Sequence, residues 1–166
     1  DPDADRCAVA VPDPAADGGW RMLRGDELGV LLGAFIADRG VDDDAVFACS
    51  IVSSRQLAAV CRAHGIEHRE TLTGFKWISR VPGLRYGYEE ALGYCVDPTA
   101  VRDKDGISAA LLVCDLAARF KASGRTLQDE LDIIARVTGV FATDQHAVRV
   151  DDVSLIADAM ARLRAQ

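Results

Sequence analysis

The segment AVFACSIV, residues 45–52, places eight small or apolar residues in a row. Its length and its content of valine, isoleucine and phenylalanine favour a strand that is covered on both faces. Segments with the spacing of amphipathic helices flank it, and strand-like and helix-like segments alternate through most of the chain. This alternation predicts an α/β protein. We expect a three-layer α/β/α sandwich with a small mixed sheet.

The flanking helices have start and stop signals. Asp26 is the expected N-cap of the first, Gly40 follows its end, and Ser53 or Ser54 caps the second, which Gly65 ends. The buried faces are expected to comprise Leu28, Leu31, Leu32, Phe35 and Ile36 in the first helix and Leu57, Val60 and Cys61 in the second. Further strands are expected at 7–11, 67–73 and 147–150 and within 86–96. Further helices are expected at 75–79, 107–122, after Thr126 (with Leu127, Leu131, Ile134 and Val137 inward) and after Asp152.

Charge and cysteine content restrict the class of partner. The net charge of −7 argues against a nucleic-acid partner, and no apolar run is long enough to predict a membrane span. The five cysteines include no CxxC pair and mostly lie in apolar runs. This pattern indicates reduced thiols in a cytosolic protein. We therefore expect a cytoplasmic location.

The stretch PDPAADGG, residues 12–19, has the composition of a turn or linker. Only one expected strand precedes it, and a lone strand cannot satisfy its backbone groups. We therefore expect three parts: 1–19, a metal-binding loop and the last strand of a truncated preceding domain; 20–145, an α/β sugar-recognition domain; and 146–166, a linker strand and helix towards a missing C-terminal domain.

The chain begins with DPDADR, which places aspartates at every second position. Three carboxylates on a tight loop can converge on a hard cation such as Mg²⁺. An EF-hand would need Gly at the sixth position and Glu at the twelfth, where this chain has Arg6 and Pro12. The alternative is a solvated acidic segment without a metal.

Three further segments have polar groups suited to an anionic or hydroxylated ligand. LTGFKWISR (72–80) places a turn beside a lysine, and YGYEEALGY (86–94) sets two glutamates between glycines. VRDKDG (101–106) places two cations before a helix N-terminus, an arrangement that favours anions. Each segment taken alone also fits an ordinary turn, hairpin loop or helix cap. The three histidines have neither a zinc spacing nor a nucleophile arrangement.

Together, and in this order, the four segments resemble the α-D-phosphohexomutase family, which includes phosphoglucomutases and phosphomannomutases. DPDADR resembles the magnesium loop of the D-G-D-x-D-R type, LTGFKWI the Thr-Gly segment, GYEEALGY the sugar-recognition loop and VRDKDG the R-x-K-D-G stretch. The resemblance implies a fragment covering the end of domain 2 and domain 3, with domains 1, 2 and 4 of the parent chain missing. The family's catalytic serine lies in domain 1, and no segment here resembles its loop.

The resemblance also implies roles. The parent enzyme would be an intramolecular phosphotransferase that interconverts sugar 1-phosphate and 6-phosphate through a bisphosphorylated intermediate, with this part inactive alone. The implied ligands of Mg²⁺ are Asp1, Asp3 and Asp5, and Arg6 would contact the phosphoryl group. The implied substrate-binding residues are Thr73, Gly74, Lys76, Glu89, Ala91 and Lys104.

Ala91 departs from the family pattern, which has serine there. A hydroxyl contact worth about 0.5–1.5 kcal/mol would be lost, and glucose, mannose and ribose phosphates stay open as substrates. Two alternatives are a phosphopentomutase-type relative and a non-catalytic module that binds a sugar phosphate; a plain α/β interaction domain is a third.

Overall fold

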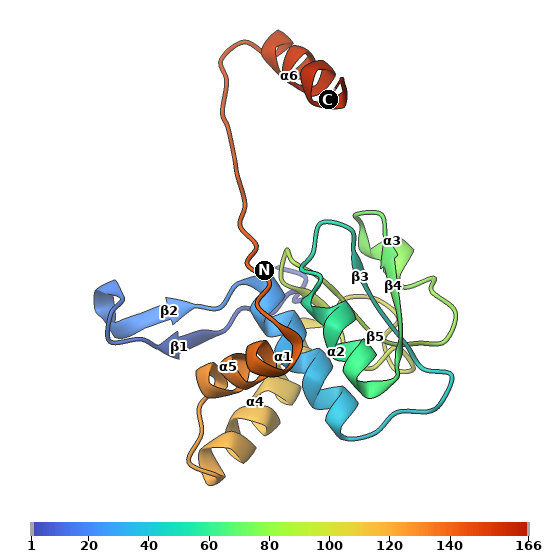
Figure 1. Cartoon of the computed structure of the whole chain (residues 1–166), viewed down its shortest axis with the longest axis vertical. Coiled ribbons are helices and arrows are strands. Elements are labelled where there is room, and N and C mark those ends of the chain that lie inside the picture. Colours follow the sequence, from blue (N-terminus) through green and yellow to red (C-terminus); the bar gives the residue numbers. More distant parts are fainter. Residues whose placement is uncertain (1, 166) are drawn as a thin grey trace.

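The computed structural model describes residues 2–165 of the chain. Its centre is a four-stranded sheet in the order β4-β3-β5-β6, of which Figure 1 labels β3, β4 and β5. β3 (Val46–Ser50) lies parallel to both β4 (Glu67–Thr71) and β5 (Leu84–Glu89), and β6 (Gly93–Cys95) is antiparallel to β5. The central strand predicted from AVFACSIV is therefore present, with every residue of β3 buried. The predicted mixed sheet is confirmed.

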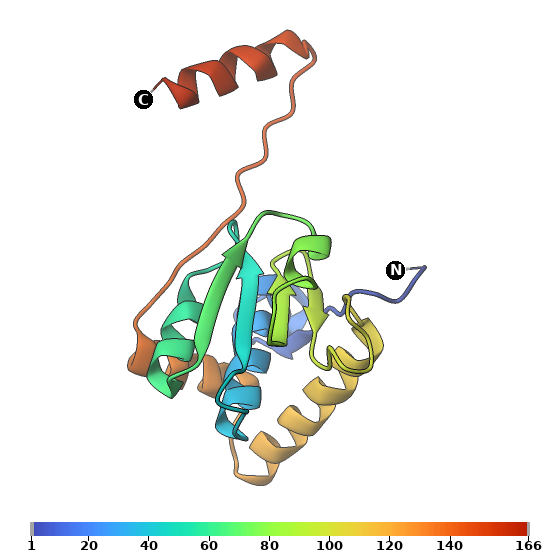
Figure 2. The same cartoon turned by 90° about the vertical axis from the view of Figure 1, so that its right-hand side faces the viewer.

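Helices cover the two faces unequally. One face carries α1 (Gly25–Asp38), α2 (Gln56–His64), α4 (Gly106–Ala122) and α5 (Leu127–Thr138), which share the larger core with side chains of β3, β5 and β6. The other face carries α3 (Phe75–Ile78), a single turn over a smaller core that includes Val46 and Ala48. The predicted α/β/α arrangement is thus confirmed, with a thick and a thin helical layer. Figure 2 views the sheet face on, with its strands side by side.

α1 packs closely on the sheet because glycines face the strands. A Cβ atom added at Gly29 would lie 2.4 Å from the ring of Tyr88, and one at Gly33 would lie 2.6 Å from Leu57. This close approach brings the buried tyrosines of β5 against α1, where the Tyr86 hydroxyl donates to the carbonyl oxygen of Gly29 at 2.7 Å. A helix with larger residues at these positions would stand further from the sheet.

The start of α1 differs from the prediction. The helix begins at Gly25 with Arg24 as its N-cap residue, so Asp26 lies inside the first turn and is not the cap. Its buried carboxylate instead accepts hydrogen bonds from the Tyr88 hydroxyl at 2.8 Å and from the Ser54 amide at 2.7 Å. Partners so distant in sequence outweigh the local capping preference of an aspartate.

The predicted ends of α1 and α2 at glycines are confirmed, because Gly40 and Gly65 follow these helices with φ angles of 81° and 70°. The predicted cap of α2 is wrong, because its N-cap residue is Arg55, without a side-chain cap. The Ser53 hydroxyl instead donates to Glu90, and the Ser54 hydroxyl accepts from the Gln56 amide at 3.2 Å. Thr126 caps α5 by accepting from the Asp129 amide. Val137 was expected to face inward and is 72% exposed. At about 100° per residue, Val137 lies about 90° away from the stripe of buried residues: Leu127, Leu131 and Ile134.

The first strand does not stand alone. β1 (Ala10–Pro12) pairs antiparallel with β2 (Trp20–Met22), and residues 13–19, with a 3₁₀ turn at Asp17–Gly19, connect them. The boundary expected after residue 19 therefore lies within a hairpin. The division of the chain into three domains stays a prediction.

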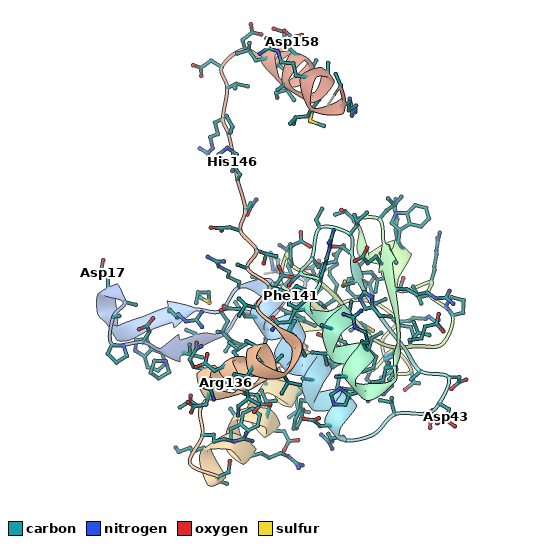
Figure 3. The ribbon with its side chains drawn as sticks, viewed as in Figure 1. Asp17, Asp43, Arg136, Phe141, His146 and Asp158 are labelled. Atoms are coloured by element: carbon teal, nitrogen blue, oxygen red, sulfur yellow. The ribbon has the colours of Figure 1, made fainter. Side chains whose placement is uncertain are left out.

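The C-terminal part extends away from the sandwich. Residues 139–153 have no regular structure and lead to α6 (Ser154–Arg164), and Asp158 on this helix lies far from the sheet (Figure 3). The strand predicted at 147–150 is wrong, because this exposed segment has no neighbouring strand to pair with. Asp152 was expected to cap α6, but the N-cap residue is Val153, which already has helical φ and ψ angles and provides no side-chain cap. The Asp152 carboxylate still accepts from the Ser154 amide at 2.9 Å, from a position one residue before the N-cap. Among the described helices, none combines the length and apolarity that a membrane span requires.

Candidate functional site

Glu89 and Gly74 meet at the carboxyl end of the parallel strands. Glu89 is the last residue of β5, and Gly74 immediately precedes α3. The Gly74 amide donates to Oε1 of Glu89 at 2.7 Å, and the φ angle of Gly74 is 115°, a conformation that glycine adopts more readily than other residues. Glu89 is 9% exposed. Its carboxylate is thus held in place at the edge of the buried region, where it can accept hydrogen bonds from a hydroxylated ligand.

Lys104 supplies a positive charge in the neighbourhood of the Glu89 carboxylate. Its Nζ lies 2.7 Å from Oδ2 of Asp5 and 5.7 Å from the centre of the Phe75 ring. The hydrogen bond between Lys104 and Asp5 lowers the pKa of Asp5 and raises the pKa of Lys104, to which the charge of Glu89 also contributes. Both members of the pair are therefore charged at neutral pH.

The N-terminal acidic segment docks beside these residues through its backbone. Arg6 forms an antiparallel bridge with Gly93, and the carbonyl oxygen of Ala4 accepts from the Gly106 amide at 3.0 Å. A Cβ atom at Gly106 would lie 2.3 Å from the carbonyl oxygen of Arg6. The glycine of the KDG sequence thus allows the acidic segment to lie against the start of α4.

The aspartates predicted to bind metal lie in different surroundings. Asp1 lies outside the described residues, Asp3 is exposed, and Asp5 pairs with Lys104 and with Arg6, whose Nε lies 3.4 Å from Oδ1. Within residues 2–165, no three His, Cys, Asp or Glu side chains form a group that could hold a metal ion. The carboxylate oxygens of Asp3 and Asp5 are nevertheless the donor type that Mg²⁺ prefers.

Three other predicted residues lie at the surface near this edge. Thr73 precedes Gly74 and is exposed, and Ala91 is exposed at the turn between β5 and β6. Lys76 is exposed and places its Nζ 5.5 Å from the centre of the Trp77 ring. Lys76 therefore contacts its sequence neighbour, whereas Lys104 lies by Asp5.

Sequence reasoning did not anticipate the partners of Glu90. Oε2 of Glu90 accepts from the hydroxyls of Ser50 at 2.8 Å and Ser53 at 3.2 Å. The sequence predicts a helix-capping role for Ser53 and no contact with Glu90. Ser50 is the last residue of β3, and Ser53 follows it. The signal available in the sequence was therefore a pair of serines at the end of a buried strand.

Asp26 is the second group that the sequence did not place at this end of the sheet. Besides Tyr88 and Ser54, it accepts from the Thr143 hydroxyl at 2.8 Å through Oδ2. The side chain of Arg24 also donates to the carbonyl oxygen of Thr143. These contacts fasten the start of the C-terminal extended segment beside the turn that carries Glu90.

Two hollows bear on where a ligand could lie. A cavity of about 630 Å³ adjoins the candidate site and is lined in part by Glu90, Ala91 and Asp26. A larger groove of about 1190 Å³ lies at the opposite end of the sheet, where Asp44 and Gly83 precede β3 and β5. The larger groove contains none of the residues predicted for binding, and the smaller hollow contains Ala91 alone among them.

Comparison with protein families gives a match over most of the sandwich. Residues 24–137 match the family described as phosphoglucomutase/phosphomannomutase, alpha/beta/alpha domain III. The matched range includes the Thr73–Gly74 segment, the glutamates of the β5–β6 turn and Lys104.

Individual relatives agree with this match. The chain is 48% identical over 164 residues to a protein of Haemophilus influenzae named "Probable phosphomannomutase", covering 99% of the chain and 33% of that protein. It is 38% identical over 150 residues to the phosphopentomutase of Homo sapiens, covering 81% and 24%. The chain thus spans about a quarter to a third of the length of these curated relatives.

A solved structure shares the fold. The crystal structure of a phosphomannomutase-type protein of Thermus thermophilus matches with a TM-score of 0.69 at 24% identity, over 84% of this chain and 30% of that one. At this level of identity the likeness concerns the fold.

Proposed function

The chain belongs to the phosphoglucomutase/phosphomannomutase family through its domain III, and on this premise we propose that it is the sugar-recognition part of a phosphohexomutase. The full-length protein would interconvert sugar 1-phosphate and sugar 6-phosphate through a bisphosphorylated intermediate. The observation that carries the proposal is the fixed carboxylate of Glu89, held by the Gly74 amide next to the Lys104–Asp5 pair.

Glu89 is the proposed acceptor for sugar hydroxyls. A carboxylate whose position is already fixed by a backbone amide loses little freedom when a ligand binds. Thr73 and Gly74 would line one side of the sugar, Ala91 the other, and Lys76 would extend the polar rim. The absence of a side-chain hydroxyl at Ala91 is compatible with hexose and pentose phosphates alike.

Lys104 is the proposed partner for the anionic side of the ligand. Its ammonium group is charged, pairs with Asp5 and is within the electrostatic influence of Glu89, so it can interact with a phosphate without leaving the site. Arg6, on the docked segment, would contact the phosphoryl group being transferred. Such enzymes act mainly by positioning and by charge neutralisation.

Asp1, Asp3 and Asp5 are the proposed ligands of Mg²⁺, because carboxylate oxygens suit this ion. When bound, the ion would neutralise charge on the phosphoryl group. The residues of the chain would orient the sugar while the serine that carries the phosphoryl group comes from the remainder of the parent protein. We therefore expect no mutase activity from residues 1–166 alone.

The proposal is tested by calorimetric titration of the full-length protein with glucose, mannose and ribose phosphates. Glu89→Gln keeps the acceptor for the Gly74 amide but loses the charge, and hydrogen bonds to charged groups contribute about 1.5–3 kcal/mol. We expect the affinity for sugar phosphate to fall about tenfold to a hundredfold. The tightest ligand then identifies the substrate.

Glu67→Gln is the matched control. Glu67 begins β4, is exposed and pairs with Arg69, so it lies at the other end of the strands. Its replacement should leave binding unchanged. Equal affinities for wild type and Glu89→Gln, or turnover of glucose 1-phosphate by residues 1–166 alone, would contradict the proposal.

A further inference from the structure

The turn between β5 and β6 must be held in place for Glu89 to keep its direction. β5 ends at Glu89 and β6 begins at Gly93, so residues 90–92 form a short connection. Leu92 has a φ angle of 68°, in the left-handed region that residues with a Cβ adopt only when their surroundings hold them there. The contacts of this turn therefore decide how precisely Glu89 is presented.

Glu90 supplies a polar anchor for the turn. Oε2 accepts from Ser50 at 2.8 Å and Ser53 at 3.2 Å, and the two hydroxyl oxygens lie 2.9 Å apart. Ser50 is 1% exposed and Ser53 9% exposed. The three oxygen atoms share two hydroxyl protons, so the carboxylate acts as the acceptor and lets both buried hydroxyls donate. Without the carboxylate, one hydroxyl could donate to the other, and the second hydroxyl proton would have no acceptor in this group.

This anchor connects the turn to the centre of the sheet. Ser50 ends β3, which runs parallel to β5 with Cys49 opposite Tyr88. From another side, the backbone of Glu90 packs against the start of α1, where a Cβ atom at Gly25 would lie 1.8 Å from the carbonyl oxygen of Glu90. Residue 90 is thus held by its side chain and by its backbone.

Resting on the proposed function of Glu89, we propose that Glu90 is a positioning residue that sets the direction of Glu89 through Ser50 and Ser53. Glu89 reaches Gly74, while its neighbour in sequence reaches the end of β3. The ligand-binding carboxylate of Glu89 and the supporting carboxylate of Glu90 are therefore adjacent in the chain but have different partners. Loss of the support should misplace Glu89 and weaken binding even though Glu89 itself is unchanged.

The test uses the full-length protein with glucose 1-phosphate as the probe. The dissociation constant, KM and kcat are measured for wild type and for each variant. Glu90→Ala removes the acceptor, and Ser50→Ala with Ser53→Ala removes both donors. We expect each change to weaken binding about tenfold or more, as losses of supporting contacts do at other sites. All three substitutions together should weaken it no more than Glu90→Ala, because they interrupt one interaction.

Glu90→Gln separates support from direct contact. Its amide oxygen can still accept from both serines, so we expect binding within about threefold of wild type, together with unchanged hydrogen exchange of the amides at 90–92. In Glu90→Ala these amides should exchange faster. If Glu90→Ala does not fold, the serine double variant, which removes two hydroxyl groups, carries the comparison.

Two results would overturn the role of Glu90. Glu90→Gln that binds as weakly as Glu90→Ala would mean that the charge itself contacts the ligand. Unchanged affinity in the serine double variant would mean that the anchor does not reach Glu89. If Glu89→Gln, measured alongside, also leaves affinity unchanged, the proposed function fails and the role of Glu90 falls with it.

Discussion

Tyr86 and Tyr88 offer a comparison in which the same atom is removed from two similar sites. Both rings are fully buried in β5, and their centroids lie 6.3 Å apart. The Tyr86 hydroxyl donates to the carbonyl oxygen of Gly29, whereas that of Tyr88 donates to the carboxylate of Asp26. Burial raises the pKa of both phenols, so each keeps its proton and acts as a donor.

The difference in acceptor sets the difference in stability. A neutral hydrogen bond contributes about 0.5–1.5 kcal/mol and one to a charged group about 1.5–3 kcal/mol. Tyr88→Phe should therefore lower the free energy of unfolding by about 1 kcal/mol more than Tyr86→Phe. In a chain of this size that difference corresponds to about 2–4 °C in the melting temperature.

The assay is urea unfolding of residues 1–166 followed by far-ultraviolet circular dichroism, since both tryptophans are exposed and report poorly on the core. The slope of the free energy with urea should match among wild type and the two variants, which keeps the comparison two-state. Equal losses for the two variants, or a larger loss for Tyr86→Phe, would refute the assignment of Asp26 as a charged acceptor for Tyr88.

Two further predictions concern α1 and its contacts. The hydrogen bond to the Val60 carbonyl, and then Asp38, raise the pKa of His64, so the stabilisation from its charge is present below the unfolded pKa of about 6.5 and is lost as pH rises through the folded pKa. The difference in unfolding free energy between wild type and His64→Gln should therefore be larger near about pH 5 than near about pH 9. A difference that stays constant with pH would contradict this. Gly29→Ala forces a Cβ against the buried Tyr88 ring and should cost about 1–3 kcal/mol. Gly33→Ala, which meets the flexible end of Leu57, should cost less in the same urea assay, and the reverse order would show that the helix can shift.

Local signals were sufficient for much of the fold. The buried strand β3, the glycines after α1 and α2, and the Thr126 cap all follow from short-range preferences that the structure retains. The predictions failed where distant partners decide. Asp26 has the residue type of a cap but lies inside the helix, because Tyr88, Ser54 and Thr143 surround its carboxylate.

The same division holds for the candidate site. The motif residues Glu89, Gly74 and Lys104 come from segments that the sequence singled out, and the fold brings them to one edge of the sheet. The support behind them could not be predicted, because the contact of Glu90 with Ser50 joins positions forty residues apart. Such a contact depends on which strand neighbours which, and a single sequence does not specify that order.

The alternation of side chains along β5 limits how this chain can change in length. Tyr86 and Tyr88 point to α1, while Gly87 faces Ile78 of α3 and Glu89 reaches Gly74. Deleting or inserting one residue within 86–89 would exchange the two sets, bringing tyrosines to the ligand side and a glutamate into the core. Evolutionary insertions and deletions should therefore be confined to the loops, and the core and the binding edge can diverge only by substitution.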